Sequence, residues 1–293
     1  MSLISVIVTT YNRPDALRAC LDSLSAQSDR DFEILIADDG SGDPTRESIA
    51  NFSKENRTAK AVTHVYQEDR GFRAGTIRNK AVACCSGAYV VFIDGDCVVF
   101  PDFISMHRKL AEPGCFVPGN RVLLSRECTD EVLSKQVSLY RKSYFYFAGL
   151  FLNRKINHCA SLLRLPLGPL RFLQKSQWKK AKTCNLAMWK KDFIAVNGFD
   201  ETFEGWGYED SDLVIRMIHA GVCRKSGRHA VPVLHLWHPE NDRSQHEANL
   251  QRFLYRLEND RLTFIDNGFD RHIVSADVPA LQKNRGSSVP ADP

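Results

Sequence analysis

The chain has 293 residues, 43% of them hydrophobic and 25% charged, and a formal net charge of +4. This composition is ordinary for a soluble globular protein. No apolar run approaches the roughly 20 residues of a membrane-spanning helix, and no basic segment precedes the first apolar residues, so we expect neither a span nor a signal peptide. The nine cysteines lack C-x-x-C spacing, and we expect buried thiols in the reducing cytosol.

The first third of the chain alternates between two kinds of pattern. Apolar, β-branched segments predict strands at residues 3–9, 32–37, 61–66 and 88–93. Helical spacing predicts helices that begin near Pro14, Asp43 and Gly75. Strands that alternate with helices are typical of βαβ units and a parallel sheet, which binds its ligands at the carboxyl ends of the strands.

Paired acids follow two of these strands: Asp38 and Asp39 after the second, and Asp94 and Asp96 after the fourth. Ionised carboxylates at the end of a core strand are costly unless something pairs with them. Two carboxylates separated by Gly95 suit a hard divalent cation with open positions, which could hold a diphosphate. The alternative is a plain turn, because Asp-Gly is common turn chemistry.

A helix is predicted from Pro101 to about residue 111, and one strand-like segment over 115–124. From Val132 to Lys191 the sequence then has thirteen Lys or Arg residues and no Asp or Glu. Residues 144–152 are unusually aromatic. This stretch is either a covering subdomain with a basic face, or an amphipathic patch that binds an anionic membrane surface or a lipid-linked substrate, with Arg164 and Arg171 among its contacts. No nucleic-acid recognition motif is present, so nucleic acid is not expected.

The last third is predicted to contain a strand over 184–189, helices over 191–196, 212–220 and 243–266, and a strand over 231–236. His235 and His238 end the last strand. A lone histidine is usually structural, but either could be a metal ligand.

A glycine- and acid-rich loop precedes the helix predicted at 212–220. It contains Trp206 between two glycines, followed by Glu209, Asp210 and Asp212. Acids at a helix N-terminus interact favourably with the helix dipole, and capping explains one of the three. The other acids and the tryptophan indicate a binding or catalytic site.

The chain resembles the family-2 glycosyltransferases with a GT-A fold in five motifs that occur in the family's order. These motifs are Val6–Asn12, Ala37–Ser41, Arg73–Asn79, Asp94–Asp96 and Gly205–Asp210. The last resembles the acceptor-side loop of β-galactosyltransferases and bacterial chondroitin-type polymerases. The resemblance covers about residues 1–130 and 180–240 and leaves the basic stretch unexplained.

The resemblance implies a role for each matching residue on the donor side. Thr9, Tyr11 and Asp39 would bind uridine, with Asp39 accepting a hydrogen bond from the uracil N3–H. Arg78 would contact the diphosphate or orient Asp94, which would face the ribose and the donor sugar. Asp96 would bind Mn²⁺ or Mg²⁺ with His235, or alternatively with His238.

On the acceptor side, the resemblance implies that Asp210 is the general base, that Glu209 binds acceptor hydroxyls and that Trp206 stacks on a sugar. One base and a metal-held leaving group imply inversion. The implied activity is transfer of Gal, GalNAc, Glc or GlcNAc from a UDP-sugar to a glycan or lipid-linked acceptor. Such a reaction belongs to bacterial surface polysaccharide or lipopolysaccharide synthesis, on the inner face of the cytoplasmic membrane.

The resulting division of the chain has four parts. They are a nucleotide-sugar-binding half at 1–130, a basic aromatic insert at 131–182, an acceptor-binding catalytic half at 183–270, and a disordered tail at 271–293. A nucleotide-dependent dehydrogenase is a poor alternative, since no G-x-G-x-x-G follows the first strand. A non-catalytic sugar- or lipid-binding protein on a GT-A fold is the remaining alternative.

Overall fold

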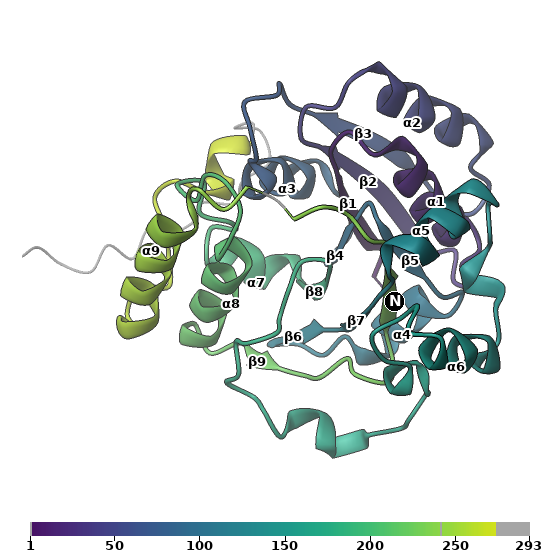
Figure 1. Cartoon of the computed structure of the whole chain (residues 1–293). Helices are drawn as coiled ribbons and strands as arrows, with labels where there is room; N and C mark the ends of the chain where they lie inside the picture. Colours follow the sequence, from purple (N-terminus) through teal and green to yellow (C-terminus); the bar gives the residue numbers. More distant parts are fainter. Residues whose placement is uncertain (1, 241, 274–293) are drawn as a thin grey trace, which may run out of the picture.

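The computed structural model describes residues 2–240 and 242–273. Helices pack on both faces of a central sheet (Figure 1). The strands are β1 Ile4–Thr10, β2 Phe32–Asp38, β3 Val62–Tyr66, β4 Tyr89–Asp94, β5 Cys97–Val99, β6 Cys115–Pro118, β7 Asn120–Leu123, β8 Asn185–Trp189, β9 Cys223–Arg224 and β10 Pro232–His235. The α-helices are α1 Pro14–Ser25, α2 Asp43–Glu55, α3 Ala74–Cys84, α4 Phe103–Leu110, α5 Arg126–Ser134, α6 Tyr144–Leu152, α7 Lys190–Ala195, α8 Glu209–His219 and α9 His246–Glu258. The 3₁₀ helices are η1 Leu139–Arg141, η2 Ala160–Leu162, η3 Gly168–Phe172 and η4 Phe269–His272.

The larger sheet has seven strands in the order β3-β2-β1-β4-β8-β6-β9. Its first four strands are parallel, and Val8 of β1 pairs with Ile36 of β2 and Ile93 of β4. Successive residues of β1 enter different cores: Val6 and Val8 pack with α1 and α2, whereas Ile7 packs with α3. Burial on both faces explains the continuous apolar runs of these strands. The predicted α/β fold is confirmed.

The segment predicted as one strand over 115–124 is two strands that belong to different sheets. β6 joins the seven-stranded sheet and β7 joins a second sheet with the order β5-β10-β7. Between them, Gly119 passes so close to Asn185 that a Cβ atom would lie 2.1 Å from its Nδ2. That Nδ2 donates a hydrogen bond of 2.5 Å to the carbonyl oxygen of Val231. Glycine allows this close passage, and there the chain changes sheets.

The three-stranded sheet carries a distant part of the chain to the end of β4. A turn at Gly95 and Asp96 leads from β4 into β5. His235 of β10 pairs with Cys97 of the antiparallel β5 and with Leu123 of the parallel β7. These three residues form one row across the sheet, so His235 lies beside the turn that follows β4.

Helices α8 and α9 are offset from the predicted spans of 212–220 and 243–266, and α9 is much shorter. Buried ion pairs fix their relation. Arg216 Nη2 lies 2.7 Å from Asp212 Oδ2, and Arg256 of α9 donates from Nε to the other oxygen of Asp212 across 3.1 Å. Buried charges need such partners. The network fixes the first turn of α8.

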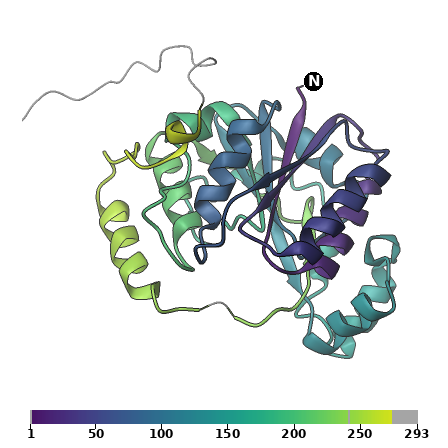
Figure 2. The same ribbon diagram turned by 90° about the horizontal axis from the view of Figure 1, so that it is seen from above.

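The basic segment 131–182 packs against the three-stranded sheet. Leu139 and Phe147 share one core with Val122 of β7 and Leu234 of β10. Seen from above, the teal helices α5 and α6 lie at one edge of the molecule (Figure 2). Among the described residues, no helix is both long and apolar enough to cross a bilayer.

The sequence-based division does not coincide with breaks in the fold. Its boundary at residue 130 falls inside α5, and β8 of the 183–270 part pairs with β4 of the first part. Residues 271 and 272 belong to η4. The rest of the predicted tail, from residue 274 on, lies outside the described residues.

Several cations of the basic segment form ion pairs or hydrogen bonds within the protein. Arg171 is buried and donates from Nη1 to the carbonyl oxygen of Ser226 across 2.7 Å. Arg164 pairs with Asp102 across 2.8 Å, and Lys155 pairs with two glutamates of α5. The prediction that Arg171 contacts a membrane is therefore wrong, because its guanidinium holds the loop before β10.

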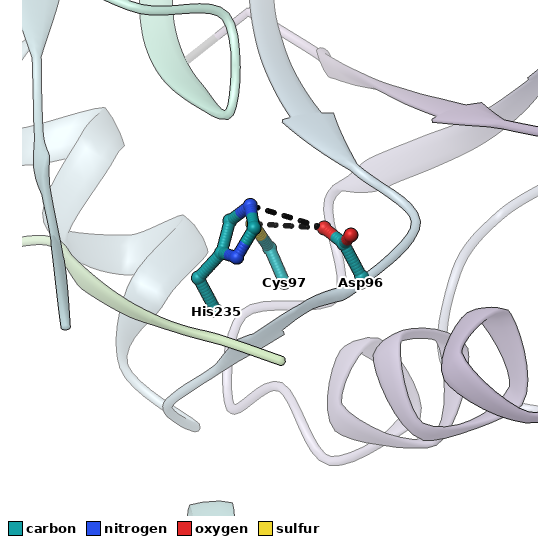
Figure 3. A group of neighbouring side chains, drawn as sticks. All are labelled: Asp96, Cys97 and His235. Atoms are coloured by element: carbon teal, nitrogen blue, oxygen red, sulfur yellow. Dashed lines mark hydrogen bonds and ion pairs between the residues drawn. The ribbon is translucent and has the colours of Figure 1, made fainter. Parts of the chain in front are cut away.

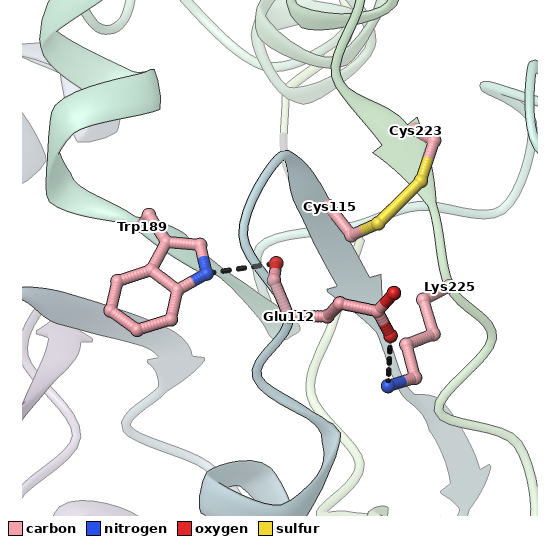
Figure 4. The surroundings of a disulfide bond; sticks show 5 residues. All are labelled: Glu112, Cys115, Trp189, Cys223 and Lys225. Atoms are coloured by element: carbon pink, nitrogen blue, oxygen red, sulfur yellow. Dashed lines mark hydrogen bonds and ion pairs between the residues drawn. A yellow bond between two sulfur atoms is a disulfide. The ribbon is translucent and has the colours of Figure 1, made fainter. Parts of the chain in front are cut away.

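Cys115 and Cys223 form a disulfide, shown in Figure 4. They meet because β6 and β9 pair in parallel with these two residues in register. The expectation of nine thiols is wrong for this pair, while the other seven cysteines are free. Disulfides persist mainly in oxidising compartments, so the cysteines do not support the predicted cytosolic location.

Candidate active site

Asp39, predicted to bind uracil, lies buried after β2. Its Oδ1 accepts a hydrogen bond of 2.5 Å from Gln67 Nε2, and its Oδ2 accepts one of 2.8 Å from the backbone N–H of Arg73. Burial raises the pKa of Asp39 although these hydrogen bonds oppose the shift. The neighbouring Asp38 lies 2.9 Å from His64 Nε2 and accepts a hydrogen bond of 2.8 Å from the Ser41 N–H. Both oxygens of each acid thus have partners within the protein, so hydrogen bonding does not distinguish Asp39 from Asp38.

Tyr11 and Thr9 lie at the carboxyl end of β1. Tyr11 is half exposed, and its hydroxyl donates to Asp69 across 2.8 Å. A Cβ atom on Gly40 would lie 2.5 Å from the Cα of Asp69, and Gly40 has φ +96°, so only glycine fits there. Thr9 Oγ1 accepts a hydrogen bond of 3.0 Å from Arg78 Nε. Tyr11 therefore faces the open edge, whereas Thr9 supports Arg78.

Arg78 connects the two halves of the predicted site. Its Nη2 donates to Oδ1 of Asp94 across 3.2 Å. Its Nη1 lies 3.6 Å from Oε1 of Glu209 and 3.7 Å from Oδ1 of Asp210. This Nη1 is buried and donates no hydrogen bond within the described part of the chain. Burial lowers the pKa of Arg78, but the charges of Asp210, Asp94 and Glu209 raise it overall.

Asp96 and His235 form the candidate metal site with Cys97 nearby (Figure 3). His235 Nε2 lies 3.5 Å from Asp96 Oδ1, and His238 Nε2 lies 3.6 Å from Asp96 Oδ2. Burial and the charge of Asp96 raise the pKa of the Cys97 thiol, and a soft sulfur ligand suits Mn²⁺ or Mg²⁺ less well than oxygen and imidazole nitrogen do. A carboxylate with an imidazole suits a first-row divalent cation. The residues therefore fit Mn²⁺, with either histidine as second ligand.

Arg13, which was not predicted as a site residue, pairs with the same acid. It donates from Nη1 to Asp96 Oδ2 across 2.6 Å and from Nη2 to the carbonyl oxygen of Trp237 across 3.0 Å. The guanidinium thereby joins the start of α1 to the segment after β10. A cation bound by Asp96 would have to compete with this pair.

The acids of the acceptor loop lie in the first turn of α8. Asp210 accepts from the Thr183 hydroxyl across 2.8 Å and from the Thr183 backbone N–H across 3.2 Å. Glu209 accepts one hydrogen bond, 3.2 Å from the N–H of Gly207. Burial, assisted by the charge of Asp210, raises the pKa of Glu209 to about 7. The capping explanation is wrong, because no side chain caps α8 and Asp212 is bound to arginines.

Trp206 lies in a loop with left-handed residues on both sides, Gly205 at φ +71° and Gly207 at φ +120°. Its ring stacks on His246 with centroids 6.2 Å apart and 18° between the planes. The guanidinium of Arg243 lies 5.3 Å from the Trp206 ring. Residues at the start of α9 thus hold the ring that was predicted to stack on a sugar.

Two further residues of the site were not predicted. Gln67 follows β3 directly, and the rule that ligands gather at strand ends could have identified it. Thr183 offers no such signal, because only the packing of the segment before β8 against α8 brings it to Asp210.

Comparison with known families agrees with the order of the motifs. Residues 5–165 match the model of glycosyl transferase family 2, and residues 171–236 match the N-terminal domain of galactosyltransferase. Validoxylamine A glucosyltransferase of Streptomyces hygroscopicus subsp. jinggangensis is 27% identical over 272 residues, which cover 87% of this chain and 60% of that protein. The chain thus spans less than two thirds of the length of that relative.

A second relative is the GalNAc(5)-diNAcBac-PP-undecaprenol beta-1,3-glucosyltransferase of Campylobacter jejuni, 29% identical over 161 residues, covering 52% of this chain and 50% of that protein. A mannosyltransferase of Pyrobaculum calidifontis in complex with GDP-Man and Mn²⁺ has a TM-score of 0.57 at 19% identity, covering 87% of this chain and 63% of that chain. S. aureus TarS 1-349 in complex with UDP has a TM-score of 0.56 at 14% identity, covering 87% and 65%. These solved structures share the fold. The chain therefore belongs to glycosyl transferase family 2 and has the GT-A fold that its motifs predicted.

Proposed function

We propose that the chain is a metal-dependent, inverting glycosyltransferase that moves Gal, GalNAc, Glc or GlcNAc from a UDP-sugar to a glycan or lipid-linked acceptor. One observation carries this proposal: Arg78 contacts Asp94 of the donor side and both Glu209 and Asp210 of the acceptor side. Transfer requires the donor and the base that activates the acceptor to meet at one bond. A non-catalytic sugar-binding protein would not need this meeting of buried acids around one cation.

On the donor side, Asp39 would accept from uracil N3–H and Tyr11 would border the nucleoside. Asp96 and His235, or Asp96 and His238, would hold Mn²⁺ or Mg²⁺. When bound, the cation supplies Lewis-acid stabilisation of the leaving diphosphate. Arg78 would orient Asp94 beside the donor sugar, and the N–H groups of its buried Nη1 could donate a hydrogen bond to the substrate.

On the acceptor side, Asp210 would accept the proton of the attacking hydroxyl. The new glycosidic bond forms at the anomeric carbon as the bond to the diphosphate breaks on the opposite face. Thr183 fixes the orientation of Asp210 through two hydrogen bonds. Glu209 would bind acceptor hydroxyls and Trp206 would pack on a sugar ring. A single displacement converts an α-linked donor into a β-linked product.

The proposed setting is bacterial surface polysaccharide or lipopolysaccharide synthesis, at the inner face of the cytoplasmic membrane. The name of the Campylobacter relative specifies an undecaprenol-linked acceptor. Within this chain, α6 has no charged residue, and Phe145 is 84% exposed. Arg141 and Lys142 precede α6 and form no ion pair within the described residues. Exposed apolar and cationic side chains together favour an anionic membrane surface.

The experiment is to measure UDP release from the four UDP-sugars with Mn²⁺, and to repeat the measurement with EDTA and with GDP-mannose. We expect one UDP-sugar to be turned over, with loss of activity in EDTA. Release only from GDP-mannose would overturn the donor assignment. If no donor is turned over, the proposal fails, and the alternative of a non-catalytic sugar- or lipid-binding protein is favoured.

A further inference from the structure

Between α6 and the end of β7 the surface contains a cavity of about 580 Å³ that the donor and acceptor residues do not use. We refer to it as the α6 groove. Its walls include Leu123, Phe151, Leu152 and Ile156, and Arg154 adds one cation. Phe151 and Leu152 are exposed, and Arg154 forms no ion pair within the described ranges. The groove is thus an open, mostly apolar surface depression with one available guanidinium.

The three-stranded sheet brings one end of the α6 groove near the candidate metal site. Leu123 pairs with His235 across β7 and β10, and the N–H of Leu124 donates to the His235 carbonyl oxygen across 3.0 Å. Asn157 extends the same row, since its N–H donates to the Leu123 carbonyl oxygen across 3.1 Å. Neighbouring strands are about 4.8 Å apart, so the groove begins within roughly two strand spacings of His235.

Apolar walls and a single guanidinium select a particular ligand chemistry. A hydrocarbon chain gains free energy from leaving water along such walls, and a guanidinium binds phosphate oxygens through paired N–H groups. A lipid-linked acceptor has these parts in this order: sugar, phosphate or diphosphate, and hydrocarbon chain. A purely polar glycan would leave the apolar walls exposed to water.

We propose that the α6 groove binds the hydrocarbon chain of a lipid-linked acceptor, with Arg154 on its phosphate, while the acceptor sugar lies near Asp210. This inference rests on the proposed glycosyltransferase function and assigns its acceptor class. Phe151 and Leu123 are specificity residues for the chain. The outer residue Phe145 of α6 does not line the groove, so it provides a matched control on the same helix.

The test measures equilibrium binding of a dansyl-labelled dodecyl phosphate, used below its aggregation concentration, to the full chain. Wild type and Phe145→Ser should bind it equally. Phe151→Ser removes an apolar wall and should weaken binding about 10- to 100-fold, the usual effect of losing one large apolar contact. Unchanged melting temperatures show that the variants are folded.

Three results would overturn the proposal. The first is absence of probe binding by wild type. The second is a loss of probe binding in Phe145→Ser that equals the loss in Phe151→Ser, since the surface would then contact the bilayer and not one chain. The same conclusion follows if Phe151→Ser leaves probe binding unchanged and weakens only sedimentation with phosphatidylglycerol vesicles. The third is a wild-type dimer that Phe151→Ser dissociates, since the groove would then be covered by a second copy.

A second assay separates the failure of this inference from the failure of the proposed function. It measures Mn²⁺-dependent hydrolysis of the UDP-sugar, which releases UDP without any acceptor. If UDP release persists in every variant while the probe does not bind, the groove assignment fails and the transferase survives. If the probe binds selectively but no UDP-sugar is turned over, the proposed function fails and the lipid site remains. For the active enzyme, Phe151→Ser should raise KM for a dodecyl-linked acceptor about tenfold or more, without changing KM for its methyl glycoside.

Discussion

The guanidinium of Arg13 lies 2.6 Å from the carboxylate of Asp96, the acid most suited to bind a metal ion. The pair joins the start of α1 to the turn after β4, and the second hydrogen bond of Arg13 reaches the carbonyl oxygen of Trp237. One positive charge therefore already neutralises the candidate ligand. A divalent cation and Arg13 would share this carboxylate or exchange for each other.

Replacing Arg13 by methionine should tighten Mn²⁺ binding. The substitution removes a competing cation, and a partly exposed ion pair contributes up to about 1 kcal/mol, so the gain should be up to about fivefold. Calorimetric titration with Mn²⁺ in the absence of donor measures it. Arg18→Met is the control, since Arg18 pairs with Asp22 and Glu55 on the outside of α1. Weaker Mn²⁺ binding by Arg13→Met would instead mean that Arg13 organises the site.

Removing the carboxylate of Asp96 should abolish turnover, as should excess EDTA. Asp96 is the acid that both candidate histidines approach. Of these, His235→Ala should weaken Mn²⁺ binding more than His238→Ala, because His235 is buried in the sheet and His238 is partly exposed. Full activity of Asp96→Ala in EDTA would exclude a metal requirement, and the opposite order of the histidine variants would exchange their roles.

Asp39→Asn should reduce the preference for UDP over CDP. In the proposed site the carboxylate would accept from uracil N3–H, whereas an asparagine amide can also donate to the unprotonated N3 of cytosine. We expect UDP affinity to fall about tenfold, which is within the usual cost of an unmade buried hydrogen bond. Competition between the two nucleotides measures the ratio. Asn keeps one acceptor oxygen for the Arg73 N–H, and its NH₂ can donate to the oxygen of a turned Gln67 amide, so the loop should stay folded. If the ratio of UDP affinity to CDP affinity is unchanged, the nucleobase does not contact Asp39.

Asp210→Asn should lower kcat by about 10²–10⁴, the usual loss for a missing general base, and leave UDP affinity near normal. Thr183→Val should cause a smaller loss, because it removes one of the two hydrogen bonds that orient the carboxylate. Product stereochemistry is an independent check, and an α-linked product from an α-linked donor would exclude single displacement. If Glu209→Gln is inactive while Asp210→Asn is active, Glu209 is the base.

The stability gain from Glu209→Gln should grow with pH. The pKa of Glu209 is raised from its usual 4.5 to about 7 by burial and by Asp210. A carboxyl whose pKa is raised in the folded state stabilises that state fully below about 4.5, and this contribution is lost as pH rises through about 7. Glutamine stays neutral, so the variant should melt several degrees above wild type at about pH 8, but not at about pH 5. The exposed Glu247→Gln serves as the control. A melting-temperature difference between Glu209→Gln and wild type that is the same at both pH values would contradict this assignment.

Several elements were predictable because their signals are local. The parallel strands follow from apolar runs buried on both faces, and Asp39, Asp94 and Asp96 follow from the rule that ligands gather at the carboxyl ends of strands. The two strands within 115–124 were predicted as one, because the break depends on Gly119 passing a distant side chain, Asn185. The Cys115–Cys223 bond was missed for the same reason, since β6 and β9 are distant in sequence.

Local patterns were enough to identify the fold class, the family and the acids that can carry the chemistry, because periodicity and short motifs involve neighbouring residues. Which of these acids meet depends on the tertiary fold. Arg78 reaches both Asp94 and Asp210 because α3 and α8 pack on the same face of the sheet. Arg13 reaches Asp96, and His235 lies beside it, because a second sheet forms after β4. Such contacts depend on the packing of distant elements, which local residue patterns do not encode.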